Sequence, residues 1–378
     1  MILAGGLTLA AFGSFLPLDA TTKITNIAPP EAFASGSVRS RGPTVALLAT
    51  RPGALHTSLY LAPAGGSETS APVATFTHLA GAVVRGSVIP GTAIVLATAD
   101  TQPTRDLSFN ASLLRVAPHE PPEALCDGVV HASRPLITRS GRVFVSRGAP
   151  GPVNAAAPAE MRVDALSVDE VDPATGALRP IHTMSGYLAF LAGSIGSEIL
   201  LYRVAPAGAD IVAVDADTGS VRPILPSLPP FARDFSVDEG ARALVFQGRH
   251  ETDSRTWVVD RVDLASGKRS RLYEGSSMSL APHVWPGGAV AYNPDGRAGL
   301  ALIGAGAPEV RGPLGEGVDV VLAASQDGRW LAALHTRSGV LPVPFAIHTE
   351  TGAAFALHGP PGARIAVAGF VPAEGGAQ

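Results

Sequence analysis

The stretches Asp172-Pro-Ala-Thr-Gly176, Asp215-Ala-Asp-Thr-Gly219, Asp263-Leu-Ala-Ser-Gly267 and His348-Thr-Glu-Thr-Gly352 all end in a Ser/Thr-Gly step. Each follows an apolar, β-rich run and precedes another, which is typical of a tight turn between two strands. The turn glycines are 43, 48 and 85 residues apart, and the last spacing is close to two periods. A repeat of about 40–50 residues made of short strands predicts a β-propeller.

The segment 232–275 shows the repeat most clearly. Period-2 alternation predicts four strands in it, at 233–237, 241–247, 256–263 and 268–273. The same plan fits six further units, at 38–78, 79–129, 130–182, 183–231, 276–317 and 318–362. We therefore predict an all-β chain that forms a single propeller of seven blades, each with four antiparallel strands. Six or eight blades, or an irregular pair of β-sandwiches, are the alternatives.

The last apolar run, Arg364–Val371, comes after a complete seventh unit and has no further strands of its own. An open ring would leave two exposed sheet edges, so this run is predicted to join the first blade and close the ring. The propeller then spans 38–371, and residues 372–378 form a short flexible tail.

The first 18 residues carry no charge and resemble the apolar part of a secretory signal without its basic start. Their length is also near the minimum for a membrane span of about 17–25 residues. We expect residues 1–37 to be a signal peptide, a membrane anchor or a docking arm, and whether residues 1–34 are cleaved stays open. The expected location is periplasmic or secreted, with a membrane contact only through this segment.

The composition narrows the function classes. The 378 residues are 46% hydrophobic and 16% charged, and the net charge is −4, so no nucleic-acid partner is expected. The single cysteine, Cys126, excludes an intramolecular disulfide and a cysteine-based metal cage. The sequence has no Gly-x-Ser-x-Gly elbow, P-loop, Rossmann fingerprint or His-Glu-x-x-His, and no cofactor is expected.

Candidate binding residues lie in or near the innermost strands, which line the channel of a propeller. They are Arg85, Arg134, Arg233, Asp319, His131, His182 and His283. Three arginines would favour an anionic ligand or the acidic side chains of a partner, and the alternative is solvated channel charges with structural pairing. The histidines lie at unequal distances from the turn glycines that follow them, so we expect no metal site.

The turn Ser325-Gln-Asp-Gly-Arg-Trp-Leu-Ala332 resembles the Ser-Pro-Asp-Gly-Lys/Arg-x-Leu-Ala signature of TolB-like propeller repeats. Looser copies lie at 236–246 and 138–145. The Asp-x-x-Thr-Gly turns are similar to those of bacterial WD-repeat-like propellers. The resemblance implies a propeller with a partner-binding role; it concerns turns, and it carries no catalytic residues.

The function expected from the sequence is a non-catalytic binding or scaffold propeller that mediates protein–protein interaction in an envelope or secreted assembly. The chain could also be a subunit of a larger assembly, with residues 1–37 as its docking arm. The alternative is a propeller hydrolase, lactonase or lyase, with His131, His182 or His283 acting at the channel mouth.

Overall fold

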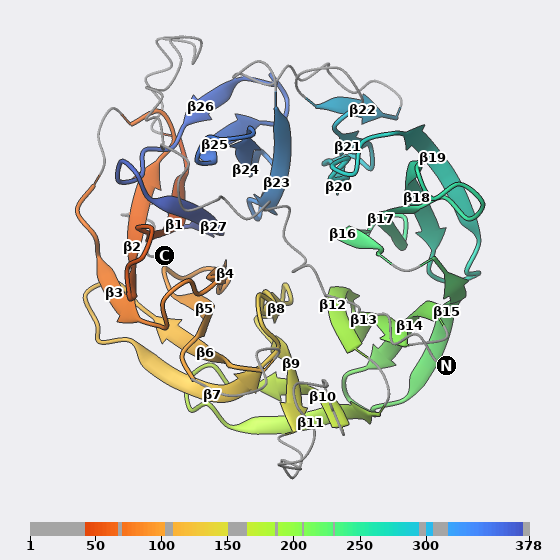
Figure 1. Cartoon of the computed structure of the whole chain (residues 1–378), viewed down its shortest axis with the longest axis horizontal. Helices are drawn as coiled ribbons and strands as arrows, with labels where there is room; N and C mark the ends of the chain where they lie inside the picture. Colours follow the sequence, from red (N-terminus) through yellow and green to blue (C-terminus); the bar gives the residue numbers. More distant parts are fainter. Residues whose placement is uncertain are drawn as a thin grey trace, which may run out of the picture.

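The computed structural model describes residues 42–66, 70–102, 109–149, 165–185, 188–205, 208–229, 231–294, 300–304 and 317–372. These residues form strands, turns and loops without a helix, and the strands are arranged as a ring of seven blades around a central axis (Figure 1). The all-β propeller fold is therefore confirmed. The expected arm at 1–37 and residues 373–378 of the expected tail lie outside the described residues.

Four blades form separate four-stranded antiparallel sheets, and in each of them the strands follow one another from the axis outward. Blade 1 contains β27 (Arg364–Val371), β1 (Thr44–Thr50), β2 (His56–Pro63) and β3 (Ala74–Thr77). Blade 4 contains β12 (Leu188–Ile195), β13 (Glu198–Ala205), β14 (Gly208–Asp215) and β15 (Val221–Leu228). Blade 5 contains β16 (Arg233–Asp238), β17 (Ala243–Arg249), β18 (Trp257–Asp263) and β19 (Arg269–Gly275). Blade 7 contains β23 (Val318–Ala324), β24 (Trp330–Thr336), β25 (Val343–His348) and β26 (Ala354–Ala356).

Blades 2 and 3 are joined into one sheet. Blade 2 contains β4 (Arg85–Val88), β5 (Val95–Asp100), β6 (Ala111–Val116) and β7 (Glu123–Val129). Blade 3 contains β8 (Leu136–Ile137), β9 (Val143–Ala149), β10 (Ala165–Val171) and β11 (Leu178–Met184). The two blades meet at one residue pair, Val129 with Arg147.

Blade 6 shows three strands, β20 (His283–Val284), β21 (Val290–Tyr292) and β22 (Ala301–Ile303). The residues expected to form its outer strand follow Gly304 and are not among the described ones.

The C-terminal strand closes the ring as predicted. β27 is the innermost strand of blade 1 and pairs antiparallel with β1, from Thr44 opposite Val371 to Thr50 opposite Arg364. The first blade therefore combines strands from the two ends of the propeller sequence (Figure 1). This arrangement removes the edges that an open ring would expose.

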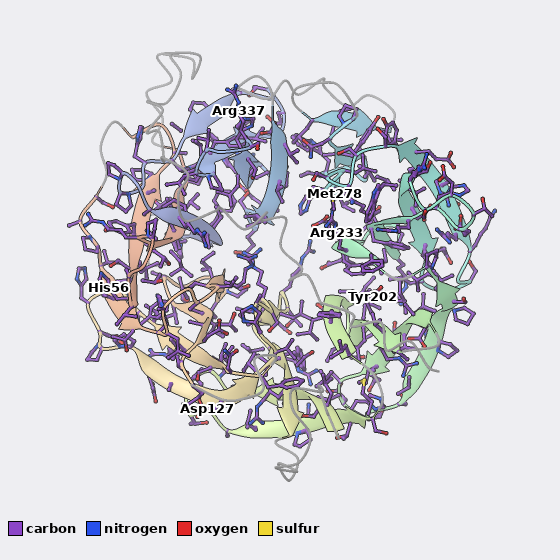
Figure 2. All side chains as sticks on the ribbon, viewed as in Figure 1. His56, Asp127, Tyr202, Arg233, Met278 and Arg337 are labelled. Atoms are coloured by element: carbon purple, nitrogen blue, oxygen red, sulfur yellow. The ribbon has the colours of Figure 1, made fainter. Side chains whose placement is uncertain are left out.

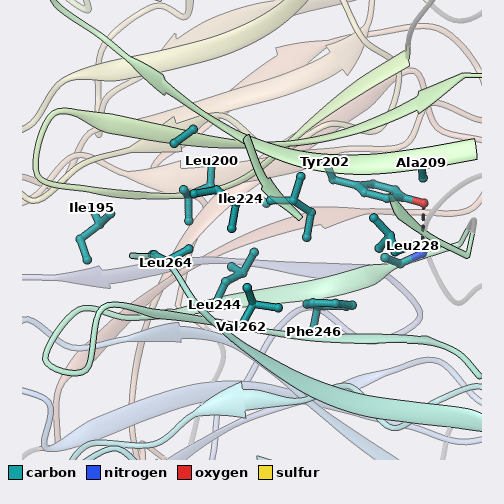
Figure 3. Packing of buried hydrophobic residues seen from close by; sticks show 14 residues of the cluster. Ile195, Leu200, Tyr202, Ala209, Ile224, Leu228, Leu244, Phe246, Val262 and Leu264 are labelled. Atoms are coloured by element: carbon teal, nitrogen blue, oxygen red, sulfur yellow. Dashed lines mark hydrogen bonds between the residues drawn. The ribbon is translucent and has the colours of Figure 1, made fainter. Parts of the chain in front are cut away.

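The core lies between neighbouring blades, where the inner faces of the sheets pack on each other. Figure 3 shows one such layer between blades 4 and 5, in which Leu200 and Tyr202 of β13 face Leu244 and Phe246 of β17. All four side chains have no measurable exposure. Burying a side chain of this size contributes about 1.5–3 kcal/mol, so these layers supply much of the stability of the ring.

The Ser/Thr-Gly turns also contribute to packing between blades. Gly176, Gly219 and Gly267 have φ values of 71°, 72° and 70°, which glycine adopts without strain. A Cβ added to Gly219 would lie 2.7 Å from the carbonyl oxygen of Ile181 in β11, the outer strand of the preceding blade. Gly176 and Gly267 approach carbonyl oxygens of their preceding blades in the same way, at 2.7 and 2.5 Å. The repeated glycine thus permits both the turn and the contact with the neighbouring blade.

Candidate functional site

Four of the predicted site residues lie in the innermost strands, as expected. Arg85 is in β4, Arg233 in β16, His283 in β20 and Asp319 in β23. Their strands come from blades 2, 5, 6 and 7, so these residues, which are far apart in the sequence, lie in strands arranged around a common axis (Figure 1).

Arg134 lies in the connection before β8 and ties four blades together. Its Nε donates to the carbonyl oxygen of Gly86 in β4 (2.7 Å), and its Nη1 donates to that of Leu322 in β23 (2.6 Å). Its Nη2 donates to the carbonyl oxygens of Val367 and Ala368 in β27, both at 3.0 Å. A planar guanidinium with five donors can serve several acceptors at once, so Arg134 cross-links blades 1, 2, 3 and 7.

Two of these four carbonyl oxygens, those of Leu322 and Ala368, belong to β-bulges. The pairing of β23 with β24 shifts between Val321 and Ala323, so Leu322 is an extra residue without a partner. The pairing of β27 with β1 shifts in the same way and leaves Ala368 unpaired. A bulged residue drops out of the strand ladder, and its carbonyl can turn toward another donor. Two bulged residues of different blades therefore meet the same guanidinium.

The charges near the axis influence one another. Burial is the main cause that lowers the pKa of Arg134 to about 10, and the charge of Arg85 is the second cause. Arg134 therefore still carries its charge at neutral pH. Burial is also the main cause that lowers the pKa of His283 to about 4, and the charge of Arg134 is the second cause. The imidazole of His283 is therefore neutral at pH 7, and its Nδ1 lies 3.4 Å from the hydroxyl of Ser236. Near the axis, the charged Arg134 therefore lies close to the uncharged His283.

Two predicted site residues form hydrogen bonds with other side chains of the propeller. Asp319 is buried, and its carboxylate lies 2.7 Å from Nδ1 of His335 in the adjacent strand β24. His131 precedes β8, and its Nδ1 lies 2.8 Å from the carboxylate of Asp100 at the end of β5. Asp319 lies in the innermost strand as predicted, and its cross-strand partner His335 holds the side chain inside blade 7, which agrees with the alternative of structural pairing.

His182 was expected just before an innermost strand, and this placement is also wrong. It lies in β11, the outermost strand of blade 3, opposite Val168 of β10. Burial is the main cause that lowers the pKa of His182, and the charge of Arg203 is the second cause. The strand that ends blade 3 extends further along the sequence than the alternation pattern indicated, which moves His182 away from the axis.

Several other buried polar side chains connect one blade to the next. Gln247 of β17 donates to the carbonyl oxygen of Met278 (2.6 Å) and accepts from the N–H of Ala281 (2.9 Å). Asn293, which follows β21, donates to the carbonyl oxygen of Asp319 and accepts from its N–H, both at 2.8 Å. Buried polar groups need such partners, and these bonds fix the connections that lead into the next blade.

Within the described part of the chain, no three His, Cys, Asp or Glu side chains are close enough together to hold a metal ion. Burial is the main cause that raises the pKa of Cys126 to about 11, opposed by the charge of Arg147. The thiol is therefore protonated at neutral pH, which does not suit a nucleophile.

The sequence pattern missed the surroundings of Arg233. Its guanidinium carbon lies 5.2 Å from the centre of the Trp257 ring, and that of Arg249 lies 5.2 Å from the same ring. Arg249 also lies 5.0 Å from the ring of Phe231. We call Phe231, Arg233, Arg249 and Trp257 the blade 5 rim cluster. The strand predicted at 241–247 ends two residues before the observed strand β17. In the structure, the pairing of β17 with β18 continues to Arg249, which lies opposite Trp257.

Comparisons with known proteins agree with the fold. No model of a known protein family matches the chain, and no curated protein matches it in sequence. TolB from Acinetobacter baumannii is similar in structure, with 12% identity and a TM-score of 0.50 over 86% of this chain and 67% of that chain. A prolyl endopeptidase is similar over 86% of this chain and 50% of its own length, with 13% identity and a TM-score of 0.54.

An oligogalacturonate lyase in complex with manganese is a more distant neighbour, with 10% identity and a TM-score of 0.44 over 79% of this chain and 70% of that chain. The resemblance to TolB-like propellers is thus confirmed at the level of the fold. Enzymes such as the prolyl endopeptidase share this fold, so function has to be argued from the residues of this chain.

The described residues contain no helix that is long and apolar enough to cross a membrane.

Proposed function

We propose that this protein is a non-catalytic binding propeller whose inner, positively charged side receives an acidic segment of a protein partner. The observation that carries the proposal is the imbalance of charge around the axis. Arg85, Arg134 and Arg233 come from three blades and lie in or next to the innermost strands. Positive charge from arginines in or next to the innermost strands favours a partner with carboxylate groups.

The acidic side chains on the described innermost strands offset little of this charge. Asp319 is paired with His335. Asp238 is paired with Arg261 at 2.7 Å. Asp234 lies 3.5 Å from Arg233, but burial raises the pKa of its carboxyl and opposes its ionisation. An acidic partner would therefore meet the positive charges of Arg134 and Arg233 near the axis.

The remaining polar chemistry also fits a scaffold better than an enzyme. His131 and His335 are each held by a buried carboxylate, and His283 is neutral beside Arg134. These groups stabilise the ring, and a rigid ring presents its loops in fixed positions for binding.

The proposed setting is the periplasm or the outside of the cell, on the basis of the uncharged segment at the start of residues 1–37. Mass spectrometry of the protein from its native host tests this. An N-terminus near residue 35, or an intact start in a membrane fraction, would support the assignment, and an intact start in a cytosolic fraction would contradict it.

The binding role is tested by quantitative affinity capture with the full chain. Arg85→Gln should weaken retention of a specific partner about tenfold, since it removes one charge contact. Arg337→Gln is the matched control, because Arg337 is exposed and lies away from the axis (Figure 2). Equal retention by both variants, with unchanged circular dichroism, would count against binding at the axis.

A further inference from the structure

The backbone around Arg233 has an unusual shape that fixes the direction of its side chain. Phe231 and Asp234 have φ values of 78° and 54°, which side chains other than glycine rarely adopt. The pairing of β16 with β17 shifts between Arg233 and Ser236, so a bulge follows Arg233 directly. Bulges and residues in sparsely populated conformations are common next to functional sites, where they redirect a side chain.

A hydrogen bond from the neighbouring blade holds this shape. The hydroxyl of Tyr202 in β13 accepts from the N–H of Ala232 at 3.2 Å, as the dashed line in Figure 3 shows. Tyr202 is fully buried, so the anchor is rigid. The position of Arg233 is thus fixed by packing between blades 4 and 5.

The ring of Trp257 lies next to both guanidinium groups, and the ring of Phe231 lies next to that of Arg249. The Nε and Nη2 atoms of Arg233 and the Nε atom of Arg249 are buried and have no hydrogen-bond partner. Asp234 is the nearby carboxyl group, and its 3.5 Å approach to Nε of Arg233 is too long for a good hydrogen bond. Buried charged donors without acceptors are costly, which makes an incoming acceptor favourable.

Apolar side chains stand exposed beside these donors. Phe231 is 41% exposed and Met278 is 56% exposed. Gln247, which pairs with Arg233 across the strands, holds the carbonyl oxygen of Met278. Figure 2 shows Arg233 and Met278 close together on the inner half of the ring. A ligand at this position would meet planar donors and an apolar surface at once.

We propose that the blade 5 rim cluster binds a polypeptide carboxylate that is adjacent to an apolar side chain. The carboxylate oxygens accept from the edges of Arg233 and Arg249, and the apolar group rests on Phe231 and Met278. Guanidinium groups match carboxylates in plane and spacing. The polypeptide nature of the ligand rests on the proposed binding function, whereas the carboxylate chemistry rests on the donors alone.

The test uses the full chain with ¹⁵N-labelled tryptophan, which gives three indole signals, from Trp257, Trp285 and Trp330. N-acetylphenylalanine supplies a terminal carboxylate, and N-acetyl-glutamyl-phenylalanine amide supplies a side-chain carboxylate. At least one should shift the Trp257 signal in a saturable way, and the one that does identifies the source of the carboxylate. N-acetylphenylalanine amide, which has no charge, should bind at least tenfold more weakly.

Matched variants separate the site from general charge. Arg249→Gln should weaken binding of the carboxylate probe at least tenfold, while Arg255→Gln should leave it unchanged, because Arg255 is exposed in the same β17–β18 loop. Arg233→Lys keeps the charge but loses the planar donors, and it should also weaken binding about tenfold. It provides a second test if Arg249→Gln does not fold.

Three results would overturn the proposal. They are equal binding of the uncharged amide, no shift of Trp257 with either carboxylate, and inorganic phosphate binding as tightly as the carboxylates. Partner capture that depends on Arg85 would survive any of these results, so failure of the rim site can be told apart from failure of the proposed binding function.

Discussion

Gly219 shows at the scale of one residue how the repeat in the sequence specifies the ring. Its φ of 72° is unfavourable for any side chain, and its Cα faces the Ile181 carbonyl oxygen of the preceding blade. Asp215, which begins this turn, accepts hydrogen bonds from the Ser197 hydroxyl in the β12–β13 turn and from Thr218, and these bonds lower its pKa to about 2. The turn motif therefore encodes both a local conformation and a contact between blades.

We predict that Gly219→Ala destabilises the protein by about 3 kcal/mol, which combines about 1 kcal/mol of backbone strain with about 2 kcal/mol from crowding. Urea unfolding followed by tryptophan fluorescence measures this loss. Gly53→Ala is the control, since Gly53 has a φ of 73° and no atom within 4 Å of the added Cβ. It should lose only about 1 kcal/mol. If the two variants lose the same free energy of unfolding, the contact with Ile181 does not contribute to stability.

β27 closes the ring, because it follows the other described strands in the sequence and completes the first blade. Removing residues 363–378 should expose the edge of β1 and leave blade 1 without its innermost strand. We expect this truncated protein to aggregate or to unfold without a single cooperative transition. Size-exclusion chromatography and thermal unfolding measure both outcomes.

The control for this deletion removes only residues 373–378 and should behave like the full chain. A soluble, cooperative protein without residues 363–378 would mean that ring closure by β27 is dispensable.

Most strands could be predicted from the sequence, and bulges could not. The four strands of blade 5 begin and end within about two residues of the predicted bounds, because turn residues separate runs that are rich in apolar and β-branched residues. The bulges at Leu322 and Ala368 leave no such signal. Which residue lacks a partner depends on the register with the next strand, and one strand's own pattern does not contain that information.

The candidate site was predictable only in part, for the same reason. Arg85, Arg233 and His283 could be placed in innermost strands by their position in the repeat. The pairing of Asp319 with His335 and the stacking of Arg249 on Trp257 depend on cross-strand neighbours. A strand pattern shows where a residue lies along the chain, and its partner is set by the fold.

In the ring as a whole, Arg134 links the joined sheet of blades 2 and 3 to the separate sheets of blades 1 and 7. Arg134→Met should destabilise the protein by about 2–4 kcal/mol, because carbonyl oxygens of β4, β23 and β27 would lose their shared donor. Guanidinium chloride unfolding measures the change.

Arg139→Met is the matched control for Arg134. Arg139 is 83% exposed and pairs with Glu239, and exposed ion pairs contribute about 0–1 kcal/mol. Similar unfolding midpoints for the two variants would refute a role for Arg134 in holding the ring together.

The register of the closing strand pair also determines how the ring responds to a pulling force. Thr44 and Val371 face each other at one end of the β1–β27 pair. Tension applied to the chain just before Thr44 and just after Val371 would load these facing residues first and break the hydrogen bonds one after another, as in opening a zipper. A shear load would have to break them together. The closure that protects the sheet edges is therefore also the mechanically weakest joint when force acts through the two ends of the ring.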